Sequence, residues 1–180
     1  MQKVWREEMG RLVKNAERFG DVVANYDPPA GNPAFRETLA QYLREHCGWE
    51  VGMENIAITA GGQTALFYLL NLFAGEFEDG TKKRVLCPLM PEYIGYVNMG
   101  VEQDFFTAKP GLIFPTEKNR FKYHIDFEHL DLTDLGAICV SRPTNPSANV
   151  LTDKEIQKLS DLAEKQGIPL IIDNAYGLPF

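Results

Sequence analysis

The residues of this sequence that are best suited to chemistry lie in the segments that follow short apolar runs. Each run has the length and composition of a buried β-strand, and a helical pattern or a turn follows it. Ligands of open parallel sheets gather at the carboxyl ends of the strands, so these positions predict a binding site. The candidates, in chain order, are Gly61, Gly62, Gln63, Tyr93, Asn145, Asp173 and Tyr176.

The first candidates are the glycines 61 and 62, which lie between the apolar run Ile56–Thr59 and a helical pattern from Gln63 to Phe73. Glycines in this position let backbone N–H groups approach a phosphate, and the helix dipole favours the anion. A plain tight turn has the same composition, so the pair by itself leaves both interpretations open.

Two tyrosines follow the apolar run Arg84–Cys87 and two prolines. A ring placed at a strand end can cover a flat ligand, and Tyr93 is the candidate for that role; a core aromatic residue under a loop is the alternative. Tyr96 lies three residues further on, at the start of a predicted helix near Glu92, and we interpret it as a core aromatic residue.

Asn145 and Asp173 follow the last two apolar runs. Asn145 lies in a loop stiffened by X-Pro pairs, where it is either a fixed donor and acceptor or a turn former. Asp173 emerges from an apolar strand, where a carboxylate is costly unless it meets a cation or several donors. A protonated pyridine nitrogen is such a cation, and capping of the following turn is the alternative.

The elements that must position these residues alternate from Asn55 onward, strand then helix, which predicts an α/β fold. We expect a mostly parallel sheet with helices on both faces, in three layers. The predicted strands are Ile56–Thr59, Arg84–Cys87, Val101–Phe106, Ala137–Val140 and Pro169–Ile172, and Thr152 with Glu155 forms a capping box for the last helix.

The residues before this alternation have helical patterns. One helix is predicted over residues 1–19 with Gly20 as its stop, and a second is predicted from the cap Asn32 and Pro33 to Gly48. We therefore divide the chain into an N-terminal helical part, residues 1–54, and an α/β part, residues 55–180.

The composition narrows the classes of partner. The 180 residues are 44% hydrophobic and carry a formal net charge of −7, which argues against nucleic acid or an anionic membrane as partner. No signal-peptide core opens the chain, and its most apolar stretch, Ala65–Ala74, is too short to span a bilayer, so a cytoplasmic location is expected. Three cysteines without C-x-x-C spacing predict neither a disulfide framework nor a metal site.

Taken together, the candidates resemble the class I/II aminotransferases of pyridoxal-phosphate (PLP) fold type I, over essentially the whole chain. The resemblance implies PLP as the cofactor and the large domain of that fold, present in part. The family's glycine-led phosphate loop matches Gly61, Gly62 and Gln63, and its ring-stacking aromatic residue matches Tyr93. The family often has Ser or Thr where Gly62 stands.

The resemblance also implies roles for the polar candidates. Asn145 matches the N-P asparagine near the cofactor hydroxyl and the substrate carboxylate, although Ser147-Ala148-Asn149 replaces the more usual T-G-x. The family's D-x-x-Y pair matches Asp173, which would hold the proton of the pyridinium nitrogen, and Tyr176, which would bond the cofactor's phenolic oxygen.

A tyrosine of the helical part is assigned in the same way. Tyr26, with Gly31 and Arg36, matches a Y-x-x-x-x-G-x-x-x-x-R loop whose tyrosine reaches the cofactor phosphate of the neighbouring subunit. The resemblance therefore implies a homodimer in the complete enzyme.

Three stretches resemble the branch of the family that exchanges amino groups between valine or alanine and 2-oxo acids such as pyruvate and 3-methyl-2-oxobutanoate: Pro91–Tyr96, Phe121–Leu130 and Ser141–Pro146. A carbon–sulfur lyase of the same fold would share every site residue, and a regulator with an aminotransferase-like ligand-binding domain is a further alternative.

The family's Schiff-base lysine lies well beyond the D-x-x-Y pair, and the last lysine here is Lys165. The isolated chain is therefore expected to be inactive. The family topology further implies that Ile56–Thr59 lacks its neighbouring strand and that Pro169–Asp173 is an exposed edge.

Overall fold

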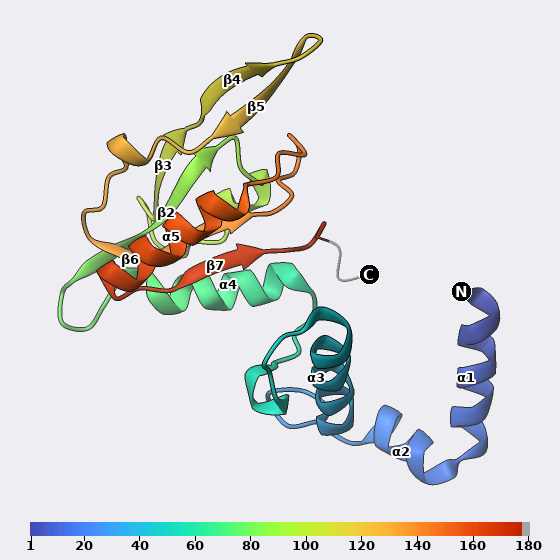
Figure 1. Ribbon diagram of the computed structural model, residues 1–180. Helices are drawn as coiled ribbons and strands as arrows, with labels where there is room; N and C mark the ends of the chain where they lie inside the picture. The colour runs from blue at the N-terminus through green and yellow to red at the C-terminus, as the bar shows by residue number, and fades with distance from the viewer. Residues whose placement is uncertain (178–180) are drawn as a thin grey trace. The chain divides into compact units, whose positions relative to one another are not determined.

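The computed structural model describes residues 1–177 and divides into two compact units, Met1–Thr59 and Ala60–Phe180. The first unit is helical, and the second contains both sheets that residues 1–177 form (Figure 1).

The first unit begins with two helices, α1 (Gln2–Lys14) and α2 (Ala16–Ala24), where the sequence predicts one. Asn15 separates them because its backbone is extended and its side chain caps α2, accepting a hydrogen bond from the N–H of Arg18 at 3.0 Å. Gly20 lies inside α2, so the predicted stop at that glycine is wrong.

Helix α3 (Pro33–Cys47) confirms its predicted boundaries. Asn32 caps it by accepting a hydrogen bond from the N–H of Phe35 at 3.1 Å, and Pro33 occupies the first turn, where no backbone donor is needed. Gly48 ends the helix in the left-handed conformation, with φ of 67°.

The strand predicted at residues 56–59 is not formed, and this prediction is wrong. No described strand pairs with this segment, which follows the short 3₁₀ helix η1 (Met53–Asn55). Its backbone bonds to the loop before α3 and to α3 itself instead. The N–H of Ile58 donates to the carbonyl of Ala30 at 2.9 Å, and Arg36 Nε donates to the carbonyl of Ile56 at 2.7 Å. The unit boundary after Thr59 places this segment with the helices.

Gly31 makes this attachment possible. Its φ is +97°, and a Cβ built on it would lie 2.7 Å from Cβ of Ile58. We expect Gly31→Ala to destabilise the first unit by roughly 2–4 kcal/mol, because backbone strain adds to the clash. Amide hydrogen exchange at Ile58 measures the loss. Gly20→Ala is the matched control: it lies within α2 with nothing within 4 Å of its added Cβ, so it should leave stability equal or higher. Equal protection of Ile58 in both variants would contradict the assignment.

The second unit is built on a five-stranded sheet in the order β1-β2-β6-β7, with β3 also paired to β2. The pairs β2–β3, β2–β6 and β6–β7 are parallel and only β1–β2 is antiparallel, which confirms the mostly parallel sheet. The strands are β1 (Gly75–Glu76), β2 (Lys82–Met90), β3 (Phe106–Pro110), β6 (Leu135–Ser141) and β7 (Leu170–Asp173).

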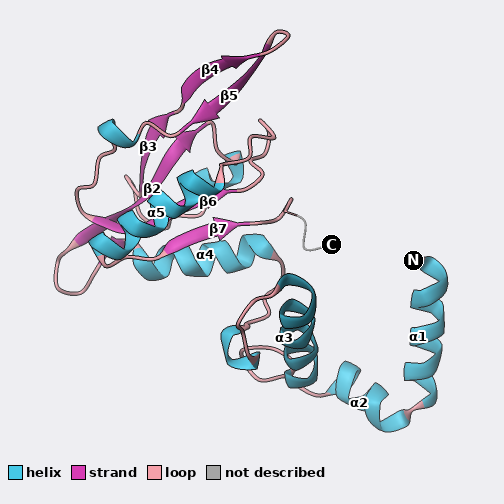
Figure 2. Cartoon of the chain, in the orientation of Figure 1, coloured by secondary structure: helices cyan, strands magenta, loops and turns pink. Residues whose placement is uncertain are grey.

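Helices cover both faces of this sheet, as predicted (Figure 2). Leu66 and Leu70 of α4 (Gly62–Phe73) pack against one face, and Leu159 and Ala163 of α5 (Asp153–Gln166) pack against the other. Strand β6 lies between them with all seven residues buried. The predicted capping box of α5, Thr152 with Glu155, is confirmed.

Strand β7 is an edge of the sheet among the described residues, as the family topology implies. Its side chain Ile172 is 42% exposed although isoleucine is normally buried. An edge of this kind presents unpaired backbone groups.

Several element boundaries around the site differ from the prediction. Strand β2 continues through Pro88, which has no backbone N–H. The pairing with β3 is irregular between Cys87 and Met90, so no regular ladder hydrogen bond is required from Pro88. Strand β3 starts later than Val101, because Asp104 has φ of 60° and interrupts the extended backbone. The predicted helix near Glu92 is only the 3₁₀ helix η2 (Ile94–Asn98).

A two-stranded hairpin, β4 (Leu112–Thr116) and β5 (Arg120–His124), was not predicted. Its turn contains Lys118 and Asn119 with positive φ, a geometry that usually calls for Asn-Gly and leaves little sequence signal here. The short 3₁₀ helix η3 (Phe127–His129) follows it.

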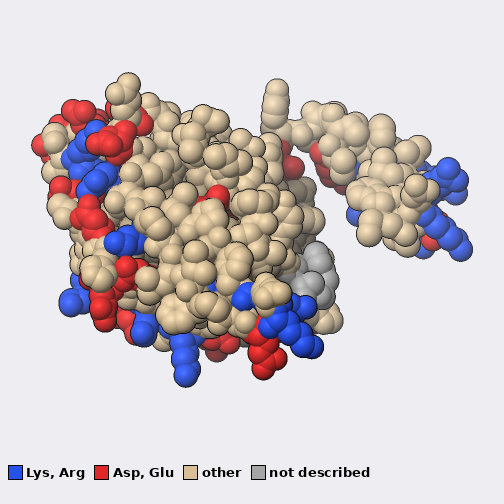
Figure 3. Space-filling view, turned by 90° about the horizontal axis from the view of Figure 1, so that it is seen from above, with Lys and Arg blue, Asp and Glu red and all other residues tan. Residues whose placement is uncertain are grey.

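The charged side chains and the cysteines of the chain show no unusual arrangement among the described residues. On the face shown in Figure 3, acidic and basic side chains lie intermixed along the margin of the second unit. Cys47, Cys87 and Cys139 are free, and burial raises the pKa of the Cys87 thiol to about 12. No helix within residues 1–177 is long and apolar enough to cross a membrane.

Candidate functional site

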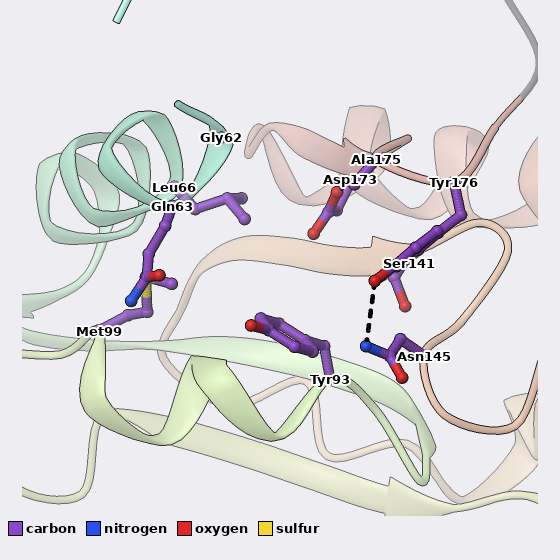
Figure 4. Close-up of a pocket in the computed structure, with 10 residues that line it drawn as sticks. All are labelled: Gly62, Gln63, Leu66, Tyr93, Met99, Ser141, Asn145, Asp173, Ala175 and Tyr176. Atoms are coloured by element: carbon purple, nitrogen blue, oxygen red, sulfur yellow. Dashed lines mark hydrogen bonds between the residues drawn. The ribbon is translucent and has the colours of Figure 1, made fainter. Parts of the chain in front are cut away.

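One cavity of about 200 Å³ lies at the carboxyl ends of β6 and β7 and beside the first turn of α4 (Figure 4). This volume is below the roughly 300–1,000 Å³ typical of ligand sites, so a ligand would be only partly enclosed by this unit. The cavity is lined by Gly62, Gln63, Leu66, Tyr93, Met99, Ser141, Asn145, Asp173, Ala175 and Tyr176.

The structure therefore brings together most residues that the sequence singled out. Six of them line the cavity directly, and Gly61 adjoins Gly62 as the cap of α4. Tyr26 belongs to the first unit, where its side chain is fully exposed, and its role stays a prediction.

Asp173 is the last residue of β7, and its carboxylate faces the cavity (Figure 4). One oxygen accepts a hydrogen bond from the hydroxyl of Tyr96 at 2.8 Å, and the other accepts one from the N–H of Ala175 at 3.0 Å. The second bond is the turn cap considered from the sequence, so capping and exposure to the cavity coexist. No Lys, Arg or His among residues 1–177 forms an ion pair with it.

Tyr96 has a polar role in addition to the core role predicted for it. Its ring is 3% exposed, in the core cluster beneath α4, and burial raises the pKa of its phenol. The phenol therefore keeps its proton and donates to Asp173. The sequence signal for a place of Tyr96 near the site was its spacing from Tyr93, because residues i and i+3 of a 3₁₀ turn lie on the same side.

Tyr93 forms a wall of the cavity, across from Ala175 (Figure 4). Its ring packs edge-on against that of Tyr96, with centroids 5.5 Å apart. Gly95 makes room for it, since a Cβ at that glycine would collide with the Tyr93 ring. Asp173 lines the same cavity as these two residues (Figure 4).

Asn145 and Tyr176 meet at another side of the cavity. Asn145 Nδ2 donates to the Tyr176 hydroxyl at 3.4 Å, near the upper limit for a hydrogen bond. Two hydrogen bonds of Thr144 fix the loop. Its N–H donates to the backbone carbonyl of Asn149 at 2.9 Å, and its hydroxyl donates to the backbone carbonyl of Ser141 at 3.1 Å. Together the amide and the phenol offer donors to one ligand oxygen.

The first turn of α4 offers an anion site. Gly61 precedes it as the N-cap residue with φ of 92°, a conformation that favours glycine. Gly62 and Gln63 of this turn line the cavity, and a Cβ at Gly62 would have no neighbour within 4 Å, so a ligand can approach the backbone of the helix start closely. The N–H groups of a helix start and the helix dipole suit a phosphate.

Two further polar residues of the site were not singled out from the sequence: Ser141, which lines the cavity, and Glu92, which does not. Glu92 is buried, and its carboxylate accepts hydrogen bonds from the N–H groups of Tyr93 and Ser141 and from the Ser141 hydroxyl. Burial raises the pKa of this carboxyl group. Only the tertiary structure shows that Glu92 and Ser141, far apart in the sequence, meet beside the cavity.

The described residues offer neither a covalent amine nor a metal site here. No lysine is among the residues that line the cavity. Within residues 1–177, no group of three or more His, Cys, Asp and Glu side chains could hold a metal ion.

Known proteins share both the sequence and the fold. The model of the family "Aminotransferase class I and II" matches residues 3–178. Valine–pyruvate aminotransferase of Escherichia coli K12 is 54% identical over 162 residues, 89% of this chain and 39% of that protein. A probable aspartate/prephenate aminotransferase of Thermus aquaticus is 31% identical over 153 residues, 84% of this chain and 37% of that protein.

Solved structures agree. The crystal structure of valine–pyruvate aminotransferase from Salmonella typhimurium LT2 aligns with a TM-score of 0.84 and 47% identity, covering 100% of this chain and 44% of that one. An alanine aminotransferase from Pyrococcus furiosus, 20% identical with a TM-score of 0.69, shows the same fold. This chain thus spans less than half the length of these relatives, and it belongs to the class I and II aminotransferases.

Proposed function

We propose that this chain provides the main part of the PLP-binding site of an aminotransferase. The enzyme moves an amino group between valine or alanine and a 2-oxo acid such as pyruvate or 3-methyl-2-oxobutanoate. The observation that carries the proposal is Asp173, a carboxylate that forms no ion pair with any residue of 1–177, in one cavity with the first turn of α4 and an aromatic wall. These features suit a cation, a phosphate and a flat ring, and PLP combines all three.

Each group of the chain has a defined task in this proposal. Bound PLP supplies an electron sink for the bond broken at the α-carbon of the amino acid. Asp173 holds the proton on the ring nitrogen, and Tyr96 holds Asp173 in place. Asn145 and Tyr176 donate to the phenolic oxygen, and the N–H groups of the first turn of α4 bind the phosphate.

The Tyr93 wall orients the ring and excludes water from one of its faces. Tyr26 is proposed to reach the cofactor phosphate of a second subunit in a homodimer, in the cytoplasm. The choice of valine and pyruvate is supported by the names of the 54% identical Escherichia coli protein and the 47% identical Salmonella protein.

Substrate exchange by the full-length protein tests the function. Valine and pyruvate should yield alanine and 3-methyl-2-oxobutanoate, detected together by mass spectrometry. Release of pyruvate and ammonia from a cysteine thioether without oxo-acid exchange would favour a carbon–sulfur lyase instead. Ligand binding without turnover of either kind would favour the regulator.

Tyr96→Phe tests the support of Asp173. Loss of one hydrogen bond to a charged group is worth about 1.5–3 kcal/mol, so kcat should fall roughly 10- to 100-fold in the full-length protein. The KM for valine should change little, because Tyr96 lies behind Asp173 and not at the substrate. Tyr68→Phe, on the exposed side of α4, is the control. A kcat for Tyr96→Phe equal to that of the control would contradict the role.

A further inference from the structure

Glu92 is a second carboxylate of this site that the catalytic roles described so far leave unused. It is only 7% exposed and follows β2, one residue before the ring wall Tyr93. No described Lys, Arg or His forms an ion pair with it. A buried carboxylate without a cation is costly unless several donors bond to it.

The hydrogen bonds of Glu92 all lead to residues that line the cavity. Oε1 accepts from the N–H of Ser141 at 2.9 Å, and Oε2 accepts from the Ser141 hydroxyl at 2.5 Å and from the N–H of Tyr93 at 3.0 Å. One carboxylate thus joins the loop after β2 to the end of β6. It fixes the aromatic wall and the serine relative to each other.

Ser141 connects the Glu92 carboxylate to the cavity, because it bonds to Glu92 and also lines the cavity. Its hydroxyl donates to Glu92, so the lone pairs of the same oxygen remain available on the cavity side. Ser141 also pairs in register with Asp173 on the neighbouring strand. Burial raises the pKa of Glu92, and the charge of Asp173 raises it further, whereas the three hydrogen bonds donated by Ser141 and Tyr93 favour the charged carboxylate.

We infer that Glu92 is a positioning residue for the cofactor ring, acting through Tyr93 and Ser141, and that its charge adds to that of Asp173 in favouring a protonated ring nitrogen. The inference rests on the proposed PLP site. Two carboxylates in place of one make the ring-nitrogen end of the cavity more negative, and the low local dielectric strengthens their field.

Ligand binding to the full-length protein separates this inference from the function on which it rests. Pyridoxamine 5′-phosphate needs no lysine, and its 1-deaza analogue has carbon in place of the ring nitrogen. The Kd of each ligand is measured by fluorescence titration. The nitrogen preference is defined as the Kd of the deaza analogue divided by the Kd of pyridoxamine 5′-phosphate. A parent protein that binds neither ligand would overturn the PLP site itself.

Glu92→Gln keeps the length of the side chain and removes its charge. We expect pyridoxamine 5′-phosphate to bind at least about tenfold more weakly, in the range for a lost charged hydrogen-bond partner. The affinity for the deaza analogue should fall less, so the nitrogen preference should decrease at least about threefold. An unchanged preference, with or without an equal loss for both ligands, would reduce Glu92 to a structural residue and overturn the inference.

Two further variants complete the test. Glu92→Asp keeps the charge but shortens the side chain. It should therefore weaken the binding of both ligands while retaining most of the nitrogen preference. A preference lost as fully as in Glu92→Gln would also overturn the inference. Glu155→Gln is the matched control, because Glu155 is likewise 7% exposed and accepts several hydrogen bonds but does not touch the cavity. It should leave the preference unchanged.

Discussion

Replacing Asp173 with alanine in the full-length protein is expected to lower kcat by roughly 10³-fold, the scale for loss of one preorganised electrostatic group. The proton on the ring nitrogen matters most when negative charge develops at the α-carbon of the substrate. The carboxylate therefore stabilises the transition state more than the bound substrate, and the KM for valine should change by only a few-fold.

Asp173→Asn separates the charge of this residue from its hydrogen bonds. The amide oxygen can still accept from Tyr96 or from the N–H of Ala175, the two present donors. Its kcat should nevertheless fall nearly as far as that of the alanine variant, because the amide carries no charge. Steady-state kinetics of both variants decide the matter. A kcat within a few-fold of the parent for either one would remove Asp173 from the catalytic site.

The 180-residue chain by itself is expected to show no valine–pyruvate exchange above the uncatalysed rate. No lysine lines the cavity, and loss of the catalytic lysine removes both the covalent nucleophile and the proton carrier. Lys82 and Lys83 lie at the start of β2, at the opposite end of the strand from the site, and Lys165 lies in the last turn of α5.

Purified chain, free of host aminotransferases, should be assayed with PLP, valine and pyruvate beside the full-length protein as control. Borohydride reduction followed by mass spectrometry gives an independent measurement, since it would mark any lysine joined to PLP. Turnover by the chain, or specific labelling of one of its lysines, would mean that an amine within residues 1–180 serves the site.

The order of strand ends was readable from the sequence because it depends on local patterns. Apolar runs followed by polar residues located Tyr93, Asn145 and Asp173, and parallel strands bring their carboxyl ends to one edge. Side-chain capping is also local, so the boundaries of α3 and the capping box of α5 were predicted correctly.

The errors arose where distant contacts override local preference. Residues 56–59 have the composition of a strand, but their backbone groups bond to the loop before α3 and to Arg36. Pro88 reads as the end of a strand, yet an irregular register lets β2 continue to Met90. Hydrogen-bond partners far along the chain decide such cases, and no window of sequence contains them.

The sequence by itself determined the α/β class and most residues that gather at the cavity, because periodicity and turn signals are properties of neighbouring positions, and its motifs resemble those of the family to which the chain belongs. Only the tertiary structure decided how these residues are held. It placed the Tyr96 hydroxyl on Asp173, 77 positions away, and the Glu92 carboxylate on Ser141, 49 positions away. Both contacts exist because burial leaves each polar group with few partners, and packing alone selects which distant group is within reach.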